Sequence, residues 1–298
     1  MRQTLTAGID GSAESLDAAQ WAAREALLRD LPLTLLHAGY APAFRTRPPE
    51  AGATAEREDH ALDTAVRKLL AGHPTLKLVP LRVPEAPVEA LLAAAESSQM
   101  LVLGSHGFSG FAGFVVGSVA LDVTARARCP VVLVRAGERP EDEHLLTLLG
   151  APSARTPYRP VVLGLDLAQS GDELLAYAFA AAAARSAPLR VLHVWRLPLL
   201  YAHGRVHEPL STPDVQAVQA ELERALTDAL DGWRDKYPGI EVTEHLVDGR
   251  AAHHLLLAST GASLVVVGRR DSAGPRLGPV THSVIHHVTC PVAVVPHA

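Results

Sequence analysis

Short runs of Val, Leu and Ile alternate along the chain with longer segments in which apolar residues recur every three or four positions. The short runs show almost no polar alternation, which is typical of parallel strands buried on both faces, and the longer segments predict amphipathic helices. The runs predict strands at residues 5–9, 33–38, 76–83, 100–103, 131–134, 161–165, 189–194, 241–246, 264–267 and 292–295. Helices are expected in the first half near residues 13–30, 53–71, 86–97 and 117–127. Strands that alternate with helices predict right-handed crossovers and an α/β fold.

This pattern of strands and helices occurs twice along the chain. In each half the first strand ends at Gly-x-Asp and the second ends at Leu-His, and Asp10 and Asp166 are separated by the same 156 residues as His37 and His193. A repeat of about 140 residues has the size of a domain rather than of a solenoid unit. The chain is therefore expected to hold two tandem open five-stranded parallel sheets, each flanked by helices.

Pro, Gly and charged residues gather between the two copies, at 136–144 and 150–157. Such a composition is typical of a boundary between domains. We expect a first domain at residues 1–137, a linker at 138–157 and a second domain at 158–298.

The last strand of each copy, at 131–134 and 292–295, would lie at a sheet edge. Unpaired edges tend to be covered or paired in native proteins. The two edges could therefore pair with each other inside one chain, as a built-in dimer, and a homodimer of two chains stays possible.

Composition narrows the class of protein. The 298 residues are 48% hydrophobic and 20% charged, with a net charge of -5, which indicates a globular protein without the basic cluster of a nucleic-acid binder. The sequence shows neither an apolar run of the roughly 18 residues that a membrane span needs nor a secretory signal at its start. Two cysteines make no disulfide framework. We expect a cytoplasmic protein that binds neither membranes nor nucleic acid.

A glycine-rich stretch, GSHGFSGFAGFVVGS, follows the fourth predicted strand at residues 104–118. Glycines permit positive φ and let backbone N–H groups approach an anion, and Gly117 and Ser118 begin a predicted helix whose free N–H groups favour a phosphate. Ser118 could also be a simple N-cap. In a parallel sheet this stretch lies at the same edge as Asp10 and Ala38. Three converging segments there predict a phosphate-binding site.

The spacing Gly-x2-Gly-x9-Gly-Ser, at Gly104, Gly107, Gly117 and Ser118, resembles the nucleotide loop of the universal stress proteins. The resemblance extends over nearly the whole chain, through the Gly-x-Asp-Gly-Ser turn, the Leu-Leu-His-Ala strand end and the Cys-Pro-Val strand starts. It identifies a tandem two-domain member, and implies a Rossmann-like fold of the adenine nucleotide alpha hydrolase-like kind. It also implies binding of ATP, or of AMP or ADP, often with Mg²⁺ and as a dimer.

The resemblance further implies a set of nucleotide-binding residues in the first domain. It assigns the adenosine half of ATP to Ile9 and Asp10, the adenine to the backbone of Ala38, the ribose to Leu103 and Gly104, and the phosphates to Gly107, Gly117, Ser118 and Val119.

The second copy departs from this motif. Asp271 stands where the second glycine would be, and Pro279 replaces the serine. A carboxylate facing a phosphate is repulsive, and proline lacks an N–H donor. We expect the second domain to keep the fold with lost or much weakened ATP binding, while Arg269, Arg270 and Arg276 leave a different anion open.

Several functions are compatible with these features. The leading one is an ATP-binding stress-response regulator that acts on a protein partner. A slow ATPase or phosphoryl-transfer enzyme is an alternative, although the absence of Lys and Arg between Gly104 and Ser118 predicts at most weak hydrolysis. A structural interaction protein without nucleotide is another. A dinucleotide oxidoreductase is disfavoured, because no Gly-x-Gly-x-x-Gly follows the first strand.

Histidines offer a further candidate chemistry. His282 and His286 have the spacing that places two imidazoles on one helix face, but no Glu or Cys completes a ligand set there, and a metal site is not expected. His37 and His193 stand at matched strand ends, where we expect structural imidazoles bonded to the backbone rather than general bases.

Overall fold

The computed structural model describes residues 4–39, 52–107, 114–169, 171–196, 201–202, 205–206, 212–271, 274 and 276–298. In the first half, the parallel strands are β1 (Thr4–Gly8), β2 (Leu33–Ala38), β3 (Leu78–Val83), β4 (Ser98–Gly107) and β6 (Val131–Arg135), and the short strand β5 (Phe114–Val115) pairs antiparallel with the end of β4. The helices are α1 (Ala13–Leu28), α2 (Gly52–Gly72), α3 (Pro87–Ala95) and α4 (Ser118–Arg126).

The second half repeats this arrangement. Its parallel strands are β7 (Val161–Gly164), β8 (Leu189–Trp195), β11 (Val242–Asp248), β12 (Leu264–Arg270) and β13 (Val292–His297), and its helices are α5 (Asp172–Arg185), α6 (Thr212–Lys236), α7 (Ala251–Ser259) and α8 (Pro279–His287). A two-residue pair, β9 (Tyr201–Ala202) and β10 (Arg205–Val206), follows β8. Short 3₁₀ turns, η3 (Pro140–Glu143) and η4 (Leu167–Gln169), lie between the halves and after β7.

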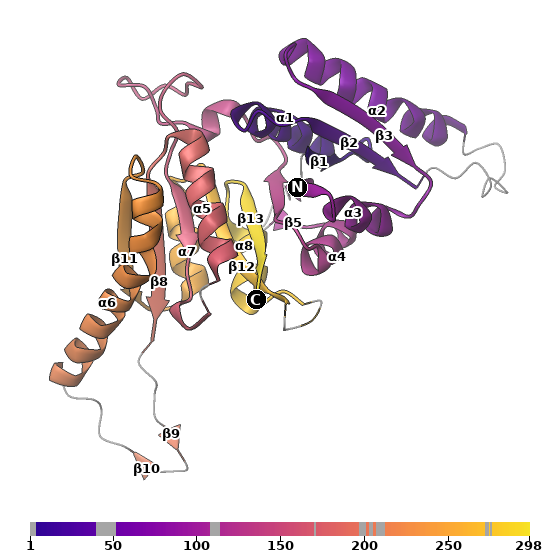
Figure 1. The fold of residues 1–298 in the computed structure, drawn as a ribbon. Coiled ribbons are helices and arrows are strands. Elements are labelled where there is room, and N and C mark those ends of the chain that lie inside the picture. The colour runs from indigo at the N-terminus through magenta and orange to yellow at the C-terminus, as the bar shows by residue number, and fades with distance from the viewer. Residues whose placement is uncertain are drawn as a thin grey trace.

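The strands form one continuous sheet in the order β11-β8-β7-β12-β13-β6-β4-β1-β2-β3 (Figure 1). Each half is parallel and has its first strand in the middle, with later strands added on either side. This confirms the predicted α/β class with two tandem five-stranded parallel units. Because the first strand of each half lies in the middle, the strand order reverses beside it, and ligands bind at such a reversal in open α/β sheets.

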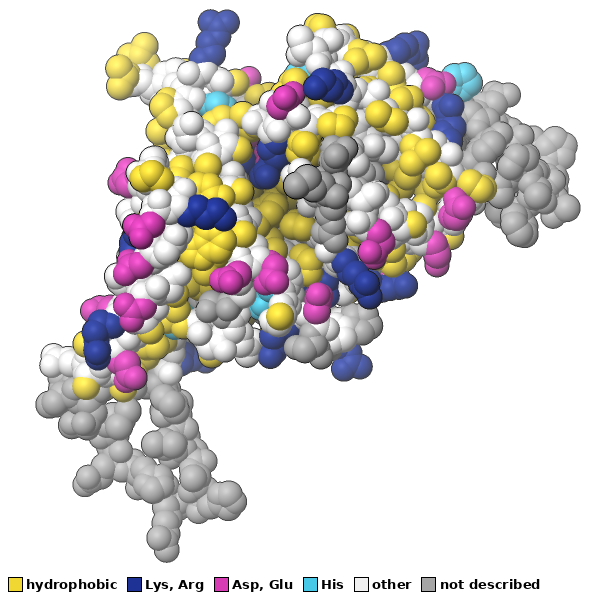
Figure 2. Space-filling model, viewed as in Figure 1, with side chains coloured by type: hydrophobic (Ala, Val, Ile, Leu, Met, Phe, Trp, Pro, Cys, Tyr) yellow, Lys and Arg dark blue, Asp and Glu magenta, His cyan; other side chains and the backbone are white. Residues whose placement is uncertain are grey.

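Helices cover both faces of the sheet in three layers (Figure 1). The core on one face packs under α1, α2, α5 and α6, and the core on the other packs under α3, α4, α7 and α8. Continuous burial along strands such as Val131–Arg135 explains why their sequences lack polar alternation. On the face drawn in Figure 2, Lys and Arg side chains are interspersed with Asp and Glu. None of the helices in the described ranges is both long and apolar enough to cross a bilayer.

The two halves join through their last strands. β13 pairs antiparallel with β6, with Val292 opposite Leu133 and Val294 opposite Val131. This confirms the predicted pairing of the two copies' edges. Both edges are apolar and buried because each is covered by the other.

Two arginines reach across this seam in a reciprocal way. The guanidinium of Arg135, at the end of β6, donates to the carbonyls of Ile285 and Val288 at the end of α8. Arg269, at the end of β12, donates to the carbonyl of Ala127 at the end of α4. Cations suit the negative end of a helix dipole. Burial lowers the pKa of Arg135 to about 10, so the guanidinium remains charged at neutral pH.

On the other face of the sheet, a buried ion pair connects α1 of the first half with α5 of the second. The carboxylate of Glu25 accepts hydrogen bonds from Arg185, at 2.7 Å, and from Arg29, also at 2.7 Å. The side chains of Glu25 and Arg185 are 1% and 0% exposed. The Arg185 guanidinium also lies 5.7 Å from the ring centre of Trp21. The contact therefore fixes the two domains against each other with charges that water does not reach.

The fourth strand is longer than its apolar run predicts, because Ser98–Gly107 extends the expected 100–103 at both ends. Gly104 and Ser105 continue the ladder opposite Val134 and Arg135, so backbone pairing maintains the strand where hydrophobicity ends. The extension carries part of the predicted glycine loop into the sheet.

Candidate functional site

A pocket of about 170 Å³ opens at the carboxyl ends of β1, β2 and β4, between the starts of α1 and α4. The predicted site residues that line it are Ile9, Asp10, Ala38, Leu103, Gly104, Gly117 and Val119. Ser118 is exposed at the start of α4 and is not among the lining residues, and Gly107 pairs with Phe114 at the end of β4. The remaining glycines of the loop, at 110 and 113, lie outside the described residues. The structure thus brings four sequence segments together at one sheet edge.

Asp10 is held in a tight turn at the mouth of this pocket. Its Oδ1 accepts hydrogen bonds from the backbone N–H of Ser12, at 2.9 Å, and from the Ser12 hydroxyl, at 2.6 Å. The Ser12 hydroxyl oxygen in turn caps α1 by accepting from the N–H of Ser15. Partial burial raises the pKa of Asp10, but the hydrogen bonds from Ser12 and Ser15 outweigh it and hold the pKa below its ordinary value. The carboxylate is therefore charged and fixed in orientation.

Gly104 is required by close packing rather than by an unusual backbone angle. A β-carbon placed on Gly104 would lie 2.5 Å from the carbonyl oxygen of Glu14 and 2.8 Å from the backbone nitrogen of Ser15. Neither Gly104 nor Gly117 adopts a positive φ, and Gly117 has open space where a side chain would begin. At these two positions, the expectation that the glycines serve positive φ is wrong. Gly104 instead lets β4 approach the first turn of α1.

The two matched histidines have the same role in each half. The Nδ1–H of His37 donates to the carbonyl of Ile9 at 2.7 Å, and that of His193 donates to the carbonyl of Leu165 at 2.9 Å. Both imidazoles are buried. The prediction that both imidazoles hydrogen-bond to the backbone is confirmed. Each bond fixes the second strand to the end of the first, and the accepting residues Ile9 and Leu165 line the two pockets.

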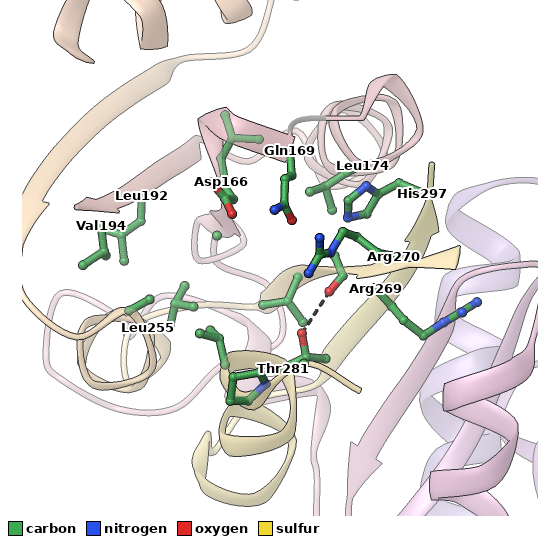
Figure 3. Close-up of a pocket in the computed structure, with 18 of the residues that line it drawn as sticks. Asp166, Gln169, Leu174, Leu192, Val194, Leu255, Arg269, Arg270, Thr281 and His297 are labelled. Carbon is green, nitrogen blue, oxygen red and sulfur yellow. Dashed lines mark hydrogen bonds between the residues drawn. The ribbon is translucent and has the colours of Figure 1, made fainter. Parts of the chain in front are cut away.

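The second domain holds a larger pocket, of about 390 Å³, at the equivalent sheet edge (Figure 3). Its lining includes Asp166, Val194, Gly268, Pro279 and Val280, which occupy the repeat positions of Asp10, Ala38, Gly104, Ser118 and Val119. The altered loop sequence has not closed the pocket. His297, at the end of β13, also lines it and was not identifiable from sequence, because no motif marks that strand end.

Asp271 does not face this pocket, and the expected repulsion from its carboxylate is therefore wrong. The carboxylate forms an ion pair with Arg269 at 2.9 Å and lies outside the lining. Arg269 in turn bonds to Ala127 of the first domain, and Figure 3 shows its side chain directed away from the pocket. Arg269 is therefore also not available to an anion there, whereas Arg270 points inward (Figure 3).

The histidine pair on α8 does not complete a metal site in the described structure. The rings of His282 and His286 lie 4.6 Å apart, and no group of three or more His, Cys, Asp or Glu side chains suited to a metal occurs among the described residues.

Comparisons with known proteins agree on one family. A model of the universal stress protein family matches residues 1–135 and 157–296. The universal stress protein Rv2005c of Mycobacterium tuberculosis is 31% identical over 303 residues, covering 97% of this chain and 96% of its own. A crystal structure of a universal stress protein from Archaeoglobus fulgidus aligns with a TM-score of 0.66 and 17% identity over 100% of this chain and 97% of its own, which shows the shared fold. A universal stress protein solved in complex with cAMP is 26% identical over 45% of this chain and 98% of its own, with a TM-score of 0.36.

Proposed function

Because the chain belongs to the universal stress protein family, we propose that it is a regulatory ATP-binding protein whose first domain, residues 1–137, holds the nucleotide. A linker at 138–157 would join this domain to the second, at 158–298. The observation that carries the proposal is the convergence of Ile9, Asp10, Ala38, Leu103, Gly104, Gly117 and Val119 in one pocket. In this proposal the protein acts in the cytoplasm through a protein partner that responds to the bound nucleotide.

The pocket offers suitable surfaces for the two ends of an adenine nucleotide. Leu36, Leu91 and Leu103 supply apolar walls near Ala38, where a flat base would be buried. At the opposite end, α4 begins at Ser118 with no side chain capping its free N–H groups. Those groups and the positive end of the helix dipole favour a phosphate. In this proposal the phosphates extend from the pocket to Gly107 and Ser118.

The charge of the pocket favours a nucleotide that brings its own cation. Asp10 and Glu14 line it, and the lining contains no Lys, Arg or His in the described part of the chain. Carboxylates repel a triphosphate unless a cation lies between them, and Mg²⁺ prefers such oxygen ligands together with phosphates. Bound Mg²⁺ would neutralise phosphate charge, with Asp10 as a nearby carboxylate. The lack of lysine and arginine among the described lining residues also favours binding over rapid phosphoryl transfer.

Two matched substitutions test where ATP binds. Ala38→Trp places an indole in the first pocket, and Val194→Trp places one at the equivalent position of the second. In calorimetric titrations with ATP and Mg²⁺, we expect Ala38→Trp to weaken binding at least about tenfold, because the indole occupies the space of the base, and Val194→Trp to leave the affinity within about threefold.

Circular dichroism and the urea midpoint of each variant serve as controls for folding. Loss of ATP binding in Val194→Trp alone, or equal affinity in both variants and the unmodified chain, would contradict the assignment to the first domain. Absence of binding by the unmodified chain at millimolar ATP would favour a nucleotide-free interaction protein.

A further inference from the structure

The two pockets of this chain occupy equivalent positions but carry opposite charge. The first has Asp10 and Glu14 as its acidic lining residues, with no Lys, Arg or His among the described ones. The second is lined by Arg270, Arg276 and His297, with Asp166 as its acidic residue among those described. An arginine-lined cavity attracts anions, and its planar guanidinium groups match the geometry of phosphate oxygens. The second pocket is therefore the better anion site by its side chains.

Arg270 is placed to contact a ligand. It ends β12, and its side chain points into the pocket, toward Gln169 (Figure 3). Within the described parts of the chain, neither Arg270 nor Arg276 forms an ion pair, whereas Arg269 is engaged by Asp271 and Ala127. Arg269 is thus neutralised by Asp271, whereas Arg270 points into the cavity and Arg276 lines it.

His297, the last residue of β13, lines the cationic end of the second pocket. His297 is 6% exposed, and its register partner across the ladder is Arg270. A β-carbon on Gly268 would lie 2.4 Å from its Nε2, so the imidazole occupies the space over Gly268. In the first pocket the corresponding space beside Gly104 is filled by the backbone of α1 instead. A side chain that can donate or accept a hydrogen bond has therefore replaced backbone at the cationic end of the second pocket.

The other end of the second pocket is apolar. Leu192, Val194 and Leu255 line it, opposite Arg270 in Figure 3. Such a wall suits the ring of a ligand, because packing the ring against it removes the apolar surfaces of both ring and wall from water. The pocket therefore combines a hydrophobic end with a cationic end.

The second copy lacks two of the groups by which a glycine-rich loop holds a chain of phosphates. Asp271 replaces the second glycine of the motif, and Pro279, the first residue of α8, contributes no N–H at the helix start. The Thr281 hydroxyl already donates to the carbonyl of Gly268, at 2.9 Å (Figure 3). Positive charge is thus concentrated at Arg270 and Arg276 rather than spread along a backbone cradle.

From these features we infer that the second pocket binds a phosphate monoester of a ring compound, of the size of a nucleoside monophosphate, with Arg270 as the residue that recognises the phosphate. The site is independent of the nucleotide proposed for the first domain. Its specificity differs in kind, since side-chain guanidinium groups replace backbone N–H groups and select one phosphate rather than three.

The test uses the full chain carrying Ala38→Trp, which removes the first pocket from the measurement. AMP serves as the probe, adenosine as the same ring without phosphate, and ATP as the triphosphate. In calorimetric titrations we expect one AMP site, at least about tenfold tighter than adenosine, with ATP no tighter than AMP. Inorganic phosphate should compete with AMP, and added salt should weaken AMP binding.

Two arginine variants in this background locate the contact. Arg270→Gln should weaken AMP at least about tenfold and leave adenosine unchanged, because it removes a charged donor to the phosphate. Arg190→Gln, on the exposed side of β8 and away from both pockets, is the matched control and should titrate like its parent.

Equal affinity for AMP and adenosine, tighter binding of ATP than AMP, or an unaltered AMP titration in Arg270→Gln would overturn the inference. If Ala38→Trp disturbs the fold, the same Arg270→Gln comparison in the otherwise unmodified chain, with Val194→Trp to remove the second site, gives the same decision. Should Ala38→Trp fail to reduce ATP binding, the first-domain proposal fails, while the Arg270 result still decides the second pocket.

Discussion

Replacing Glu25 with alanine is expected to destabilise the chain by about 3–5 kcal/mol, because the guanidinium of Arg185 would be left charged and buried without its partner. The pair lies between α1 and α5, so the loss falls on the contact between the two domains. Urea unfolding followed by circular dichroism measures the change through the midpoint.

Two further variants separate the buried charge from other effects. Asp122→Ala removes an exposed pair with Arg126 on α4 and should cost no more than about 0.5–1 kcal/mol. Replacing both Glu25 and Arg185 with Met should restore most of the lost stability, since no unpaired charge remains. An unchanged midpoint in Glu25→Ala would show that water reaches Arg185, contrary to the structure.

The same pair predicts a pH dependence. Burial raises the pKa of Glu25, but Arg185 and Arg29 outweigh it and hold the pKa below its usual value of 4.5. A carboxylate with a lowered pKa contributes its stability above the unfolded value and loses it as the pH falls through the folded value. The stability advantage of the unmodified chain over the double Met variant should therefore shrink as the pH falls below 4.5. An advantage that is constant with pH would contradict this account.

Substituting alanine for Gly104 is the second change with a large expected effect. The new β-carbon would meet the backbone of Glu14 at 2.5 Å, and backbone cannot rotate away as a flexible side chain can. Overpacking of this kind costs about 1–3 kcal/mol. Because the displaced turn of α1 also holds Asp10 through Ser12, ATP binding should weaken together with stability.

Gly117→Ala is the matched control for this prediction. It adds the same single carbon at another glycine of the first pocket, where nothing lies within 4 Å of the new atom. Its unfolding midpoint should fall by clearly less than that of Gly104→Ala. Equal midpoints for the two variants would show that the contact between β4 and α1 is looser than described.

The sheet could be predicted from sequence because its strands are buried apolar runs at repeated spacing. The strand Leu33–Ala38 is found at its expected residues, and the pairing of β13 with β6 follows from two equivalent edges within one chain. Local hydrophobicity carries this information, so elements and their duplication are readable without the three-dimensional structure.

Contacts between the two copies could not be predicted in this way. In the sequence, Asp271 and Arg269 look like ordinary loop charges. In the structure, Arg269 donates a hydrogen bond to the carbonyl of Ala127 and forms an ion pair with Asp271, whereas Arg270 faces the pocket. His297 enters the second pocket only because β13 runs beside β12. Such roles depend on long-range packing, which periodicity does not encode.

A crystal structure of the full chain grown with ATP and Mg²⁺ tests the central claim most directly. We expect the adenine beside Ala38 and the phosphates at Gly117 and the start of α4, with no triphosphate in the pocket of Arg270. A triphosphate bound beside Arg270, with none in the first pocket, would contradict it.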